Sequence, residues 1–413
     1  MSVVTEERVE AEVLEWFHAE WDATLSLVDW RDRLVGSGWA VPSWSSRWFG
    51  RDLPVWADRV AHTTIRKAGG VAVPLGGGFA LAAPTMYDHG SEELKERFLR
   101  RTLTGELLWC QLFSEPGAGS DLAGLKATAV RDGDDWIVNG QKLWNTSAHH
   151  ADMGILVART DWEAQKHAGL SYFLIDMHQD AVEVRQIEQM NYYNSFNEVF
   201  MTDAVVPHEN MVGGLGDGWK VARSTLAHER SFGSSRSVFI AEGASGRCIE
   251  EARGEYDEWK KTYVWYPQRQ GRVDLLVERA RLAGKLDDPL VRQAIARTLS
   301  FHRAAELTAG RAKAARELGR PPGSEGSIGK LALSEVARRC NAAHSTIAGA
   351  DAMLRHSDDT GHATVAEILV STPAQSIAGG TDEIQRNILG ENMLGLPKEP
   401  AADRGMPFRE VGR

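Results

Sequence analysis

The first hundred residues carry apolar side chains at helical spacing. Val13, Trp16 and Phe17, for example, fall three and four positions apart, and the same spacing recurs along this region. Such spacing places the apolar side chains on one face of a helix. The pattern therefore predicts a series of amphipathic helices over residues 5–108.

The middle third of the chain shows a different pattern. β-branched and aromatic residues occur in short runs, as in WIVNGQKLW around the Asn139-Gly140 pair, in MGILVART and in SYFLIDM. Short runs of this kind are typical of strands joined by tight turns, and Asn-Gly is a common hairpin turn. We expect antiparallel strands over residues 109–212.

Helical periodicity returns after the glycine-rich segment GGLGDGW and continues from Trp219 to Leu396. Pro321-Pro322 interrupts it and predicts a loop between two long helices. The segment from Leu396 onward is expected to be a poorly ordered tail. The pattern thus predicts helices, then strands, then helices.

One stretch without charged residues, over residues 68–87, is long enough to suggest a membrane span. Pro74, Pro84 and three consecutive glycines interrupt it, and helix breakers would leave backbone groups unsatisfied in lipid. We therefore expect buried helical pieces around a tight turn, and no membrane span.

The composition narrows the class of protein. The 413 residues are 43% apolar and 25% charged, which is typical of a soluble globular protein. The formal net charge of −10 gives no attraction to nucleic acid or to anionic lipid. Three widely spaced cysteines argue against a disulfide scaffold, and the acidic N-terminus lacks the basic start and apolar block of a secretory signal. We expect a cytoplasmic protein that binds no nucleic acid.

Several common catalytic motifs do not occur. The glycine cluster at residues 213–218 does not fit G-x-G-x-x-G, because Leu215 replaces the second glycine, and no G-x-x-x-x-G-K-[ST] loop is present. His228-Glu229 begins like the zinc motif H-E-x-x-H, but Phe232 stands in place of the second histidine. We therefore expect neither a Rossmann nucleotide site nor a metal site.

The most specific segment covers residues 109–160 and reads WCQLFSEPGAGSDLAGLKATAVRDGDDWIVNGQKLWNTSAHHADMGILVART. It resembles the acyl-CoA dehydrogenase signature over its whole length, and the resemblance continues to the later segment AGGTDEIQRNILGE. The resemblance implies an α+β, mainly α fold of the acyl-CoA dehydrogenase type, with FAD as the cofactor. The expected parts are an N-terminal helical domain (residues 1–108), a middle antiparallel β domain (109–212), a C-terminal four-helix bundle (213–400) and a tail (401–413).

The SEPGAGSD segment also has a meaning without the family. Two glycines and a proline build a tight loop whose backbone N–H groups and hydroxyls can meet a polar or anionic ligand. A plain tight turn explains the same pattern equally well. The resemblance implies that Gln111, Phe113 and Ser114 lie along the isoalloxazine and ribityl parts of FAD, and that Ser120 contacts the acyl-CoA.

Two further segments are implied to bind the cofactor. Trp144 and Thr146 are two residues apart, so an extended segment would point both side chains to the same face. The resemblance implies that Trp144 packs on the flavin and that Thr146 donates to its polar edge. It also implies that Thr381 and Glu383 contact the AMP half of FAD.

The diphosphate of the cofactor requires a positive partner. In this family an arginine from a neighbouring subunit usually supports it, and a guanidinium suits a diphosphate bidentately. The matching segment VERARLAGKLDDPLVRQAIA offers Arg279 and Arg281. Arg281 is our candidate, the choice between the two stays open, and a helix-surface position explains either one equally well.

Removing a proton next to a thioester requires a carboxylate within reach. Most relatives place it directly before the Gly-Thr of the C-terminal motif, where this chain has Gly379. A smaller branch, including isovaleryl-CoA and long-chain acyl-CoA dehydrogenases, places it on an earlier helix, where this chain has Glu229-Arg230. A helix glutamate is ordinarily a solvated charge. The glycine at the usual position nevertheless favours Glu229 as the base, with Arg230 binding substrate.

The resemblance implies an enzyme that oxidises an acyl-CoA to the 2-enoyl-CoA and passes electrons to an electron-transferring flavoprotein. It also implies a homotetramer, or a two-plus-two heterotetramer like some actinobacterial enzymes of sterol side-chain degradation. Two alternatives keep the same fold: a flavin oxidase or monooxygenase, and a non-catalytic partner subunit. Nothing in the sequence fixes the length, branching or steroid content of the acyl group.

Overall fold

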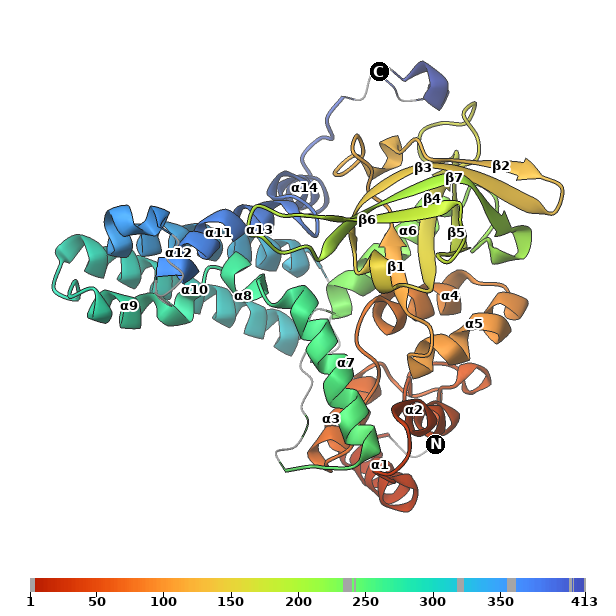
Figure 1. Cartoon of the computed structure of the whole chain (residues 1–413), viewed down its shortest axis with the longest axis horizontal. Helices are drawn as coiled ribbons and strands as arrows, with labels where there is room; N and C mark the ends of the chain where they lie inside the picture. Colours follow the sequence, from red (N-terminus) through yellow and green to blue (C-terminus); the bar gives the residue numbers. More distant parts are fainter. Residues whose placement is uncertain are drawn as a thin grey trace. The chain divides into compact units, whose positions relative to one another are not determined.

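The chain forms helices, then strands, then helices, in the predicted order (Figure 1). The computed structural model describes residues 4–232, 240, 243–317, 323–354, 362–400, 403 and 405–411. The chain divides into two compact units. The first unit comprises Met1–Ile187, Asn194–Thr262 and Asp403–Arg413, and the second comprises Glu188–Tyr193 and Tyr263–Ala402.

Five α-helices precede the sheet, and capping side chains fix where three of them begin. The hydroxyls of Thr5, Ser26 and Ser91 each accept a hydrogen bond from the backbone N–H three residues further on. Apolar residues face inward at the predicted spacing, since Val13 and Phe17 are buried. The predicted helical region is confirmed. Its helices are α1 (Glu6–Glu20), α2 (Leu27–Gly36), α3 (Trp56–Lys67), α4 (Ala83–His89) and α5 (Glu92–Thr104).

The uncharged stretch over residues 68–87 is broken, as predicted. It contains a turn of π-helix, η2 (Gly78–Ala82), followed directly by the start of α4. A Cβ on Gly78 would lie 2.9 Å from the Trp109 ring, so only glycine lets the backbone approach strand β1 (Trp109–Leu112) here. Within the described ranges, no helix is both long enough and apolar enough to cross a membrane.

Seven strands form one sheet with the order β1-β4-β2-β3-β7-β6, and β5 pairs with β4. Four pairings (β2–β3, β3–β7, β6–β7 and β4–β5) are antiparallel, as predicted. β1 instead runs parallel to β4, and β2 meets β4 in one parallel pairing, so the sheet is mixed. Side-chain alternation does not encode strand direction, which is why the sequence pattern missed this. The strands are β1 (Trp109–Leu112), β2 (Thr128–Asp132), β3 (Asp135–Thr146), β4 (Met153–Arg159), β5 (Leu170–Asp176), β6 (Val182–Ile187) and β7 (Phe196–Pro207).

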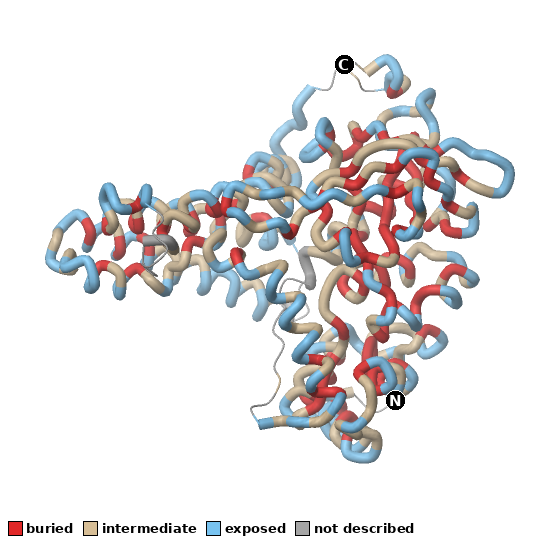
Figure 2. The backbone as a smooth tube through the Cα atoms, in the orientation of Figure 1, coloured by how far each residue is buried: buried red, intermediate tan, exposed pale blue. Residues whose placement is uncertain are grey.

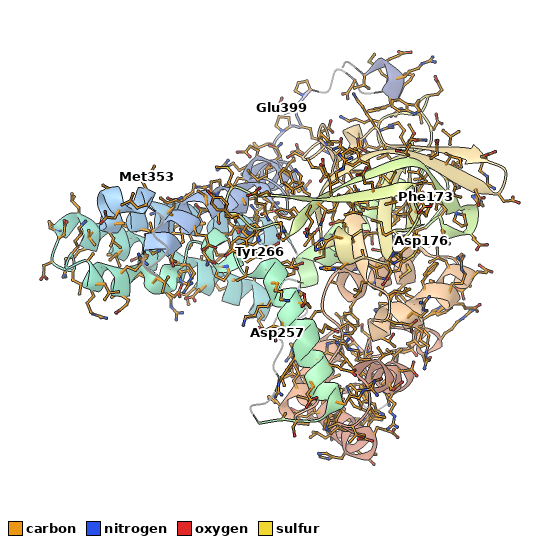
Figure 3. All side chains as sticks on the ribbon, in the orientation of Figure 1. Phe173, Asp176, Asp257, Tyr266, Met353 and Glu399 are labelled. Atoms are coloured by element: carbon orange, nitrogen blue, oxygen red, sulfur yellow. The ribbon has the colours of Figure 1, made fainter. Side chains whose placement is uncertain are left out.

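Strand β5 separates two apolar cores. Tyr172 and Leu174 belong to the core shared with the N-terminal helices. Phe173 and Ile175 belong to a second core, which is formed mainly by side chains of the sheet strands. Successive side chains of a strand point to opposite faces, so a strand that is apolar throughout is buried on both. Buried positions accordingly gather in β4 and β5 (Figure 2). The buried run ends at the exposed Asp176, which is labelled with Phe173 in Figure 3.

The Asn139-Gly140 pair is not a hairpin turn. Both residues lie inside β3, where the pairing with β7 shifts register between Val138 and Gly140. The turn between β2 and β3 occurs instead at Gly133, whose φ is +56°. A Cβ on Gly140 would lie 2.6 Å from that of Ala127, so the glycine serves a bulge and a close approach.

Helices return after the sheet, as predicted. In the first unit, α6 (Gly218–Phe232) packs against β5, α4 and η2. The following helix α7 (Arg247–Tyr263) is fixed to α2 because the buried Arg31 guanidinium binds both oxygens of Glu255, at 2.6 and 2.8 Å. These helices belong to the first unit, and the expected domain boundaries at residues 108, 212 and 400 stay predictions.

The second unit is helical. Its long helices α10 and α11 pack together, and Val291 and Cys340 lie in their shared core. The predicted break falls between these helices, while Pro321 and Pro322 themselves lie outside the described residues. The helices are α8 (Tyr266–Arg269), α9 (Leu276–Leu282), α10 (Pro289–Glu317), α11 (Glu325–Ala348), α12 (His362–Ser371), α13 (Pro373–Ile377) and α14 (Asp382–Ile388).

The expectation of a poorly ordered tail is wrong for residues 405–411. The backbone N–H of Phe408 donates to the Ala164 carbonyl at 2.9 Å, and that of Arg409 donates to the Trp162 carbonyl at 3.1 Å. The Phe408 side chain is only 6% exposed. Burial of this one aromatic ring against the rest of the first unit therefore helps to order the segment.

Candidate active site

The SEPGAGSD loop directly follows β1 and is a tight turn, as predicted. Glu115 and Ala118 exchange two backbone hydrogen bonds, each with 3.0 Å between N and O. Pro116 and Gly117 form the exposed tip between them. Ser120 lies beyond the turn and is exposed, so a ligand can reach it. Its contact with acyl-CoA stays a prediction.

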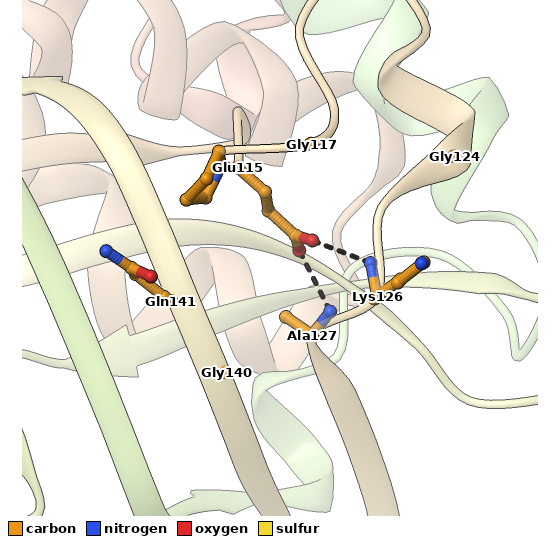
Figure 4. A pocket seen from close by; sticks show the side chains of 8 residues that line it. Glu115, Gly117, Gly124, Lys126, Ala127, Gly140 and Gln141 are labelled. Atoms are coloured by element: carbon orange, nitrogen blue, oxygen red, sulfur yellow. Dashed lines mark hydrogen bonds between the residues drawn. The ribbon is translucent and has the colours of Figure 1, made fainter. Parts of the chain in front are cut away.

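A buried ion pair holds this loop on the sheet. The Lys142 ammonium of β3 donates to the Glu115 carboxylate at 2.8 Å and to the Phe113 carbonyl at 3.1 Å. The backbone N–H groups of Lys126 and Ala127 also donate to Glu115, at 2.7 and 2.9 Å (Figure 4). The Lys142 side chain has no exposed surface. Burial lowers the pKa of Lys142, and the Glu115 carboxylate opposes that shift.

Glu115 and Lys142 were not among the residues identified from sequence. A glutamate in a loop and a lysine in a strand are individually ordinary. The one feature of the sequence that could have pointed to this pair is that both residues lie in the family signature segment, residues 109–160. Glu115 also lines a pocket of about 270 Å³, but its carboxylate already accepts three hydrogen bonds, which suits a structural acceptor rather than a base. The pocket is lined by Glu115, Pro116, Gly117, Gly124, Lys126, Ala127, Gly140 and Gln141 (Figure 4).

The end of β1 lies next to the end of β3. The side-chain amide of Asn145 donates to the Gln111 carbonyl at 2.7 Å. The backbone N–H of Leu143 donates to the Ser114 carbonyl at 2.8 Å. The structure therefore brings two of the residues expected along the flavin to the segment 143–146, which carries two more.

Trp144 does not have the extended geometry that was expected. Its φ is +64°, and the pairing of β3 with β7 is irregular between Leu143 and Asn145. The regular alternation fails there, so the condition of an extended segment is not met, and a shared face of Trp144 and Thr146 does not follow from strand geometry. The indole is 54% exposed and meets the Phe196 ring edge-on, with 5.7 Å between centroids. The flavin contacts of both residues stay predictions.

Glu229 lies near the end of α6 and is half-buried. It follows the fully buried Ala222 and Thr225 by seven and four residues, so it shares their face of the helix. That face packs against α4 and β5, because the Thr225 hydroxyl meets hydroxyls of both elements. The helical spacing thus turns Glu229 toward the protein. Arg230 also belongs to α6, but its side chain lies outside the described part of the structure.

A buried network of hydroxyl groups fixes this helix one turn before Glu229. The Thr225 hydroxyl lies 2.9 Å from that of Thr85 on α4 and 3.1 Å from that of Tyr172 on β5. All three side chains are buried. The Tyr172 ring also packs edge-on against Phe113, with 5.8 Å between centroids. Tyr172 therefore contacts both the helix of Glu229 and a residue expected beside the flavin.

Replacing Thr225 by valine is expected to destabilise the protein by about 1–3 kcal/mol, because buried hydroxyls of Thr85 and Tyr172 lose a partner. The midpoint of urea unfolding measures this. Thr308→Val is the control, since the exposed Thr308 hydroxyl donates to the Ala304 carbonyl of its own helix. Equal midpoints for the two variants would show that the network contributes nothing.

In the second unit, the C-terminal motif forms a glycine turn followed by a short helix. Gly379 and Gly380 have φ of +68° and +87°, a left-handed backbone that favours glycine. The Thr381 hydroxyl accepts from the Ile384 N–H at 3.3 Å and so caps α14. Its hydrogen can still be donated to a ligand. Glu383 is exposed in the first turn, and the AMP contacts of Thr381 and Glu383 stay predictions.

The two candidate arginines differ in their surroundings on α9. Arg281 is exposed and forms an ion pair with Glu278. Arg279 is half-buried and lies near His344. Burial lowers the pKa of His344 to about 4, and the positive charge of Arg279 contributes to this shift. The contact of Arg281 with a diphosphate stays a prediction, with Arg279 as the alternative. In the part of the chain that the structure describes, no cluster of three or more His, Cys, Asp or Glu side chains could hold a metal ion.

Comparison with known proteins covers nearly the whole chain. Family models for the acyl-CoA dehydrogenase N-terminal, middle and C-terminal domains match residues 3–106, 110–204 and 271–394. The acyl-CoA dehydrogenase IpdE1 of Mycobacterium tuberculosis is 34% identical over 371 residues, which are 90% of this chain and 88% of IpdE1. The acyl-CoA dehydrogenase FadE34 of the same organism is 39% identical over 321 residues, 77% of this chain but 39% of FadE34.

Solved structures show the same fold. The crystal structure of the ChsE4-ChsE5 complex from Mycobacterium tuberculosis has a chain that is 25% identical, with a TM-score of 0.65. The match covers 97% of this chain and 100% of that one. The helices, the middle sheet and the signature segment agree with these matches over nearly the full length. The chain therefore belongs to the acyl-CoA dehydrogenase family.

Proposed function

We propose that this chain is an FAD-dependent acyl-CoA dehydrogenase that converts an acyl-CoA thioester to the 2-enoyl-CoA, with Glu229 as the base. The observation that carries the proposal is the half-buried position of Glu229 on the inward face of α6, one turn after the buried Thr225. A carboxylate on a rigid helix, partly withdrawn from water, suits removal of a proton from the α carbon. Gly379 has no side chain for this role at the position that most relatives use.

The side chains of the first unit suit a flavin. Members of this family bind FAD. The exposed Trp144 indole provides a flat aromatic surface, and Ser114 and Thr146 provide hydroxyls on the neighbouring ends of β1 and β3. When bound, FAD supplies the acceptor for the hydride that leaves the β carbon. The other proposed FAD contacts are Gln111, Phe113, Arg281, Thr381 and Glu383.

The chain's own residues have three tasks in the proposed reaction. Glu229 takes the α proton, and Ser120 and Arg230 bind the substrate. Gly379 keeps a backbone N–H that can donate to the thioester carbonyl as negative charge develops there. The glycine-rich stretch over residues 71–83 contains η2, against which α6 packs, and is the wall proposed to shape the acyl pocket.

The partners are proposals from the family. We propose that an electron-transferring flavoprotein accepts the electrons, and that the chain assembles as a homotetramer or as a two-plus-two heterotetramer. The ChsE4-ChsE5 relative, which was solved as a complex of two different chains, supports keeping the second arrangement. The substrate class that follows is an acyl-CoA of fatty acid or sterol origin, in the cytoplasm.

Anaerobic titration of the purified protein with a panel of acyl-CoA esters tests the proposal. Straight, branched and steroid-bearing esters are added in turn, and bleaching of the visible flavin absorbance is followed. We expect at least one ester to bleach the flavin stoichiometrically. The ester that reduces the flavin most completely shows which kind of acyl group the pocket accepts. Rapid recolouring in air without an electron-transferring flavoprotein would indicate an oxidase or monooxygenase. Protein that stays colourless and inactive, alone and with a partner chain, would indicate a non-catalytic subunit.

A further inference from the structure

A segment near the end of the chain packs against the connection between β4 and β5. This docking segment consists of Asp403 and residues 405–411. Its Phe408 and Arg409 donate backbone hydrogen bonds to that connection, and Pro407 forms a β-bridge with Gln165. Chain positions more than 230 residues apart are thereby held together within the first unit.

Phe408 covers a buried guanidinium. The Cζ atom of Arg159 lies 3.4 Å from the centroid of the Phe408 ring, and Arg159 has no exposed surface. On its other sides Arg159 donates to backbone carbonyls of Ala123 at 2.7 Å, of Leu125 at 3.2 Å and of Lys166 at 3.2 Å. A buried cation of this kind is stable only while its donors and its face are fully occupied.

Two of the three carbonyls that Arg159 holds, those of Ala123 and Leu125, lie just after the SEPGAGSD loop. Ala123 and Leu125 follow Ser120 by three and five residues. A second link is made by Lys166, whose ammonium lies 2.6 Å from the Asp121 carboxylate and 3.9 Å from that of Asp403. The docking segment therefore reaches the loop twice, through Arg159 and through Lys166.

We propose that the docking segment positions the substrate-binding loop, with Phe408 as the positioning residue that acts through Arg159. The loop is fixed at its beginning by the Glu115–Lys142 pair and at its end by Arg159, and the exposed Ser120 lies between these two anchors. Removal of the Phe408 ring opens one face of the guanidinium to water, and the end of the loop loosens. The inference rests on the proposed function, because the role of Ser120 in binding acyl-CoA comes from it.

Phe408→Ala tests the proposal, and Arg409→Ala is the matched control. Arg409 is the next residue of the segment, but its side chain forms a surface ion pair with Glu163, so its loss costs little. For Phe408→Ala we expect the KM for acyl-CoA to rise about tenfold, well below the ~10²-fold that a 1 Å misplacement can cost. The kcat at saturating substrate changes less than about threefold, because Glu229 is untouched.

Hydrogen exchange gives a readout that does not depend on activity. Amides of residues 114–125 are expected to exchange faster in Phe408→Ala than in the wild type or in Arg409→Ala, and Phe408→Tyr is expected to restore both exchange and KM. An unchanged exchange rate in this loop overturns the proposal, as does a lowered thermal stability with an unchanged KM. If no acyl-CoA ester reduces the flavin of the wild-type protein, the proposed function is refuted instead. Faster exchange of the loop amides in Phe408→Ala would still show that the docking segment holds this loop.

Discussion

Glu229→Gln is expected to lower the rate of flavin reduction by acyl-CoA by about 10³-fold or more, within the range that loss of a general base produces. Glutamine has nearly the same volume and keeps the helix packing of α6, but its amide cannot accept the α proton. The half-buried position on the same face as Thr225 means that water has limited access to replace the lost base. Binding of FAD and of acyl-CoA should stay close to that of the wild type.

Stopped-flow reduction under anaerobic conditions measures this effect, with ligand affinity determined separately from the shift of the flavin spectrum. Glu96→Gln is the control, because Glu96 is an exposed glutamate on α5 in the same unit. We expect the control to reduce its flavin at the wild-type rate. Reduction of Glu229→Gln at that same rate would reject Glu229 as the base, and attention would turn to another carboxylate near the flavin.

The order of the elements could be predicted because it depends on side-chain period alone. Helical spacing around Val13 and Phe17 records the buried face of a helix, and the apolar run through Phe173 records a strand that is buried on both faces. Strand direction and bulges leave no such record. The sequence pattern favours a turn at Gly140 and an extended segment at Trp144, yet both residues lie within β3, where its pairing with β7 shifts.

The residues that hold the candidate site in place were harder to predict from the sequence than the residues proposed to contact the ligands. The family motif names Ser114 and Ser120, whereas the contacts that hold them come from distant positions. Phe408 meets Arg159 across 249 positions of sequence, and neither residue shows in isolation that it is buried. The contact between Phe408 and Arg159 depends on how distant parts of the chain pack together, and local sequence propensity does not predict it. The catalytic assignment of Glu229 likewise depended on the resemblance, since a helix glutamate is ordinarily solvated.

Breaking the buried Glu115–Lys142 ion pair has the largest expected effect on stability. Lys142→Met is expected to destabilise the protein by about 3–5 kcal/mol, because it leaves a buried carboxylate without its cation. The Glu115 side chain is only 9% exposed, so water cannot replace the ammonium, and the Phe113 carbonyl loses its donor as well. Lys261→Met is the control, because Lys261 pairs with Glu258 on the exposed surface of α7, and its loss should cost about 1 kcal/mol or less.

Urea unfolding of Lys142→Met, Glu115→Gln and the double variant forms a cycle that isolates the pair. If the buried charge is the cause, the double variant is expected to be more stable than Lys142→Met alone, since the neutral amide that replaces the Glu115 carboxylate no longer needs a cation. FAD content should follow the same order, because the loop that carries Ser114 loses its anchor on β3. A Lys142→Met protein with wild-type stability and full FAD content would show that the two backbone N–H groups on Glu115 suffice. The ion pair would then be dispensable for holding the signature loop.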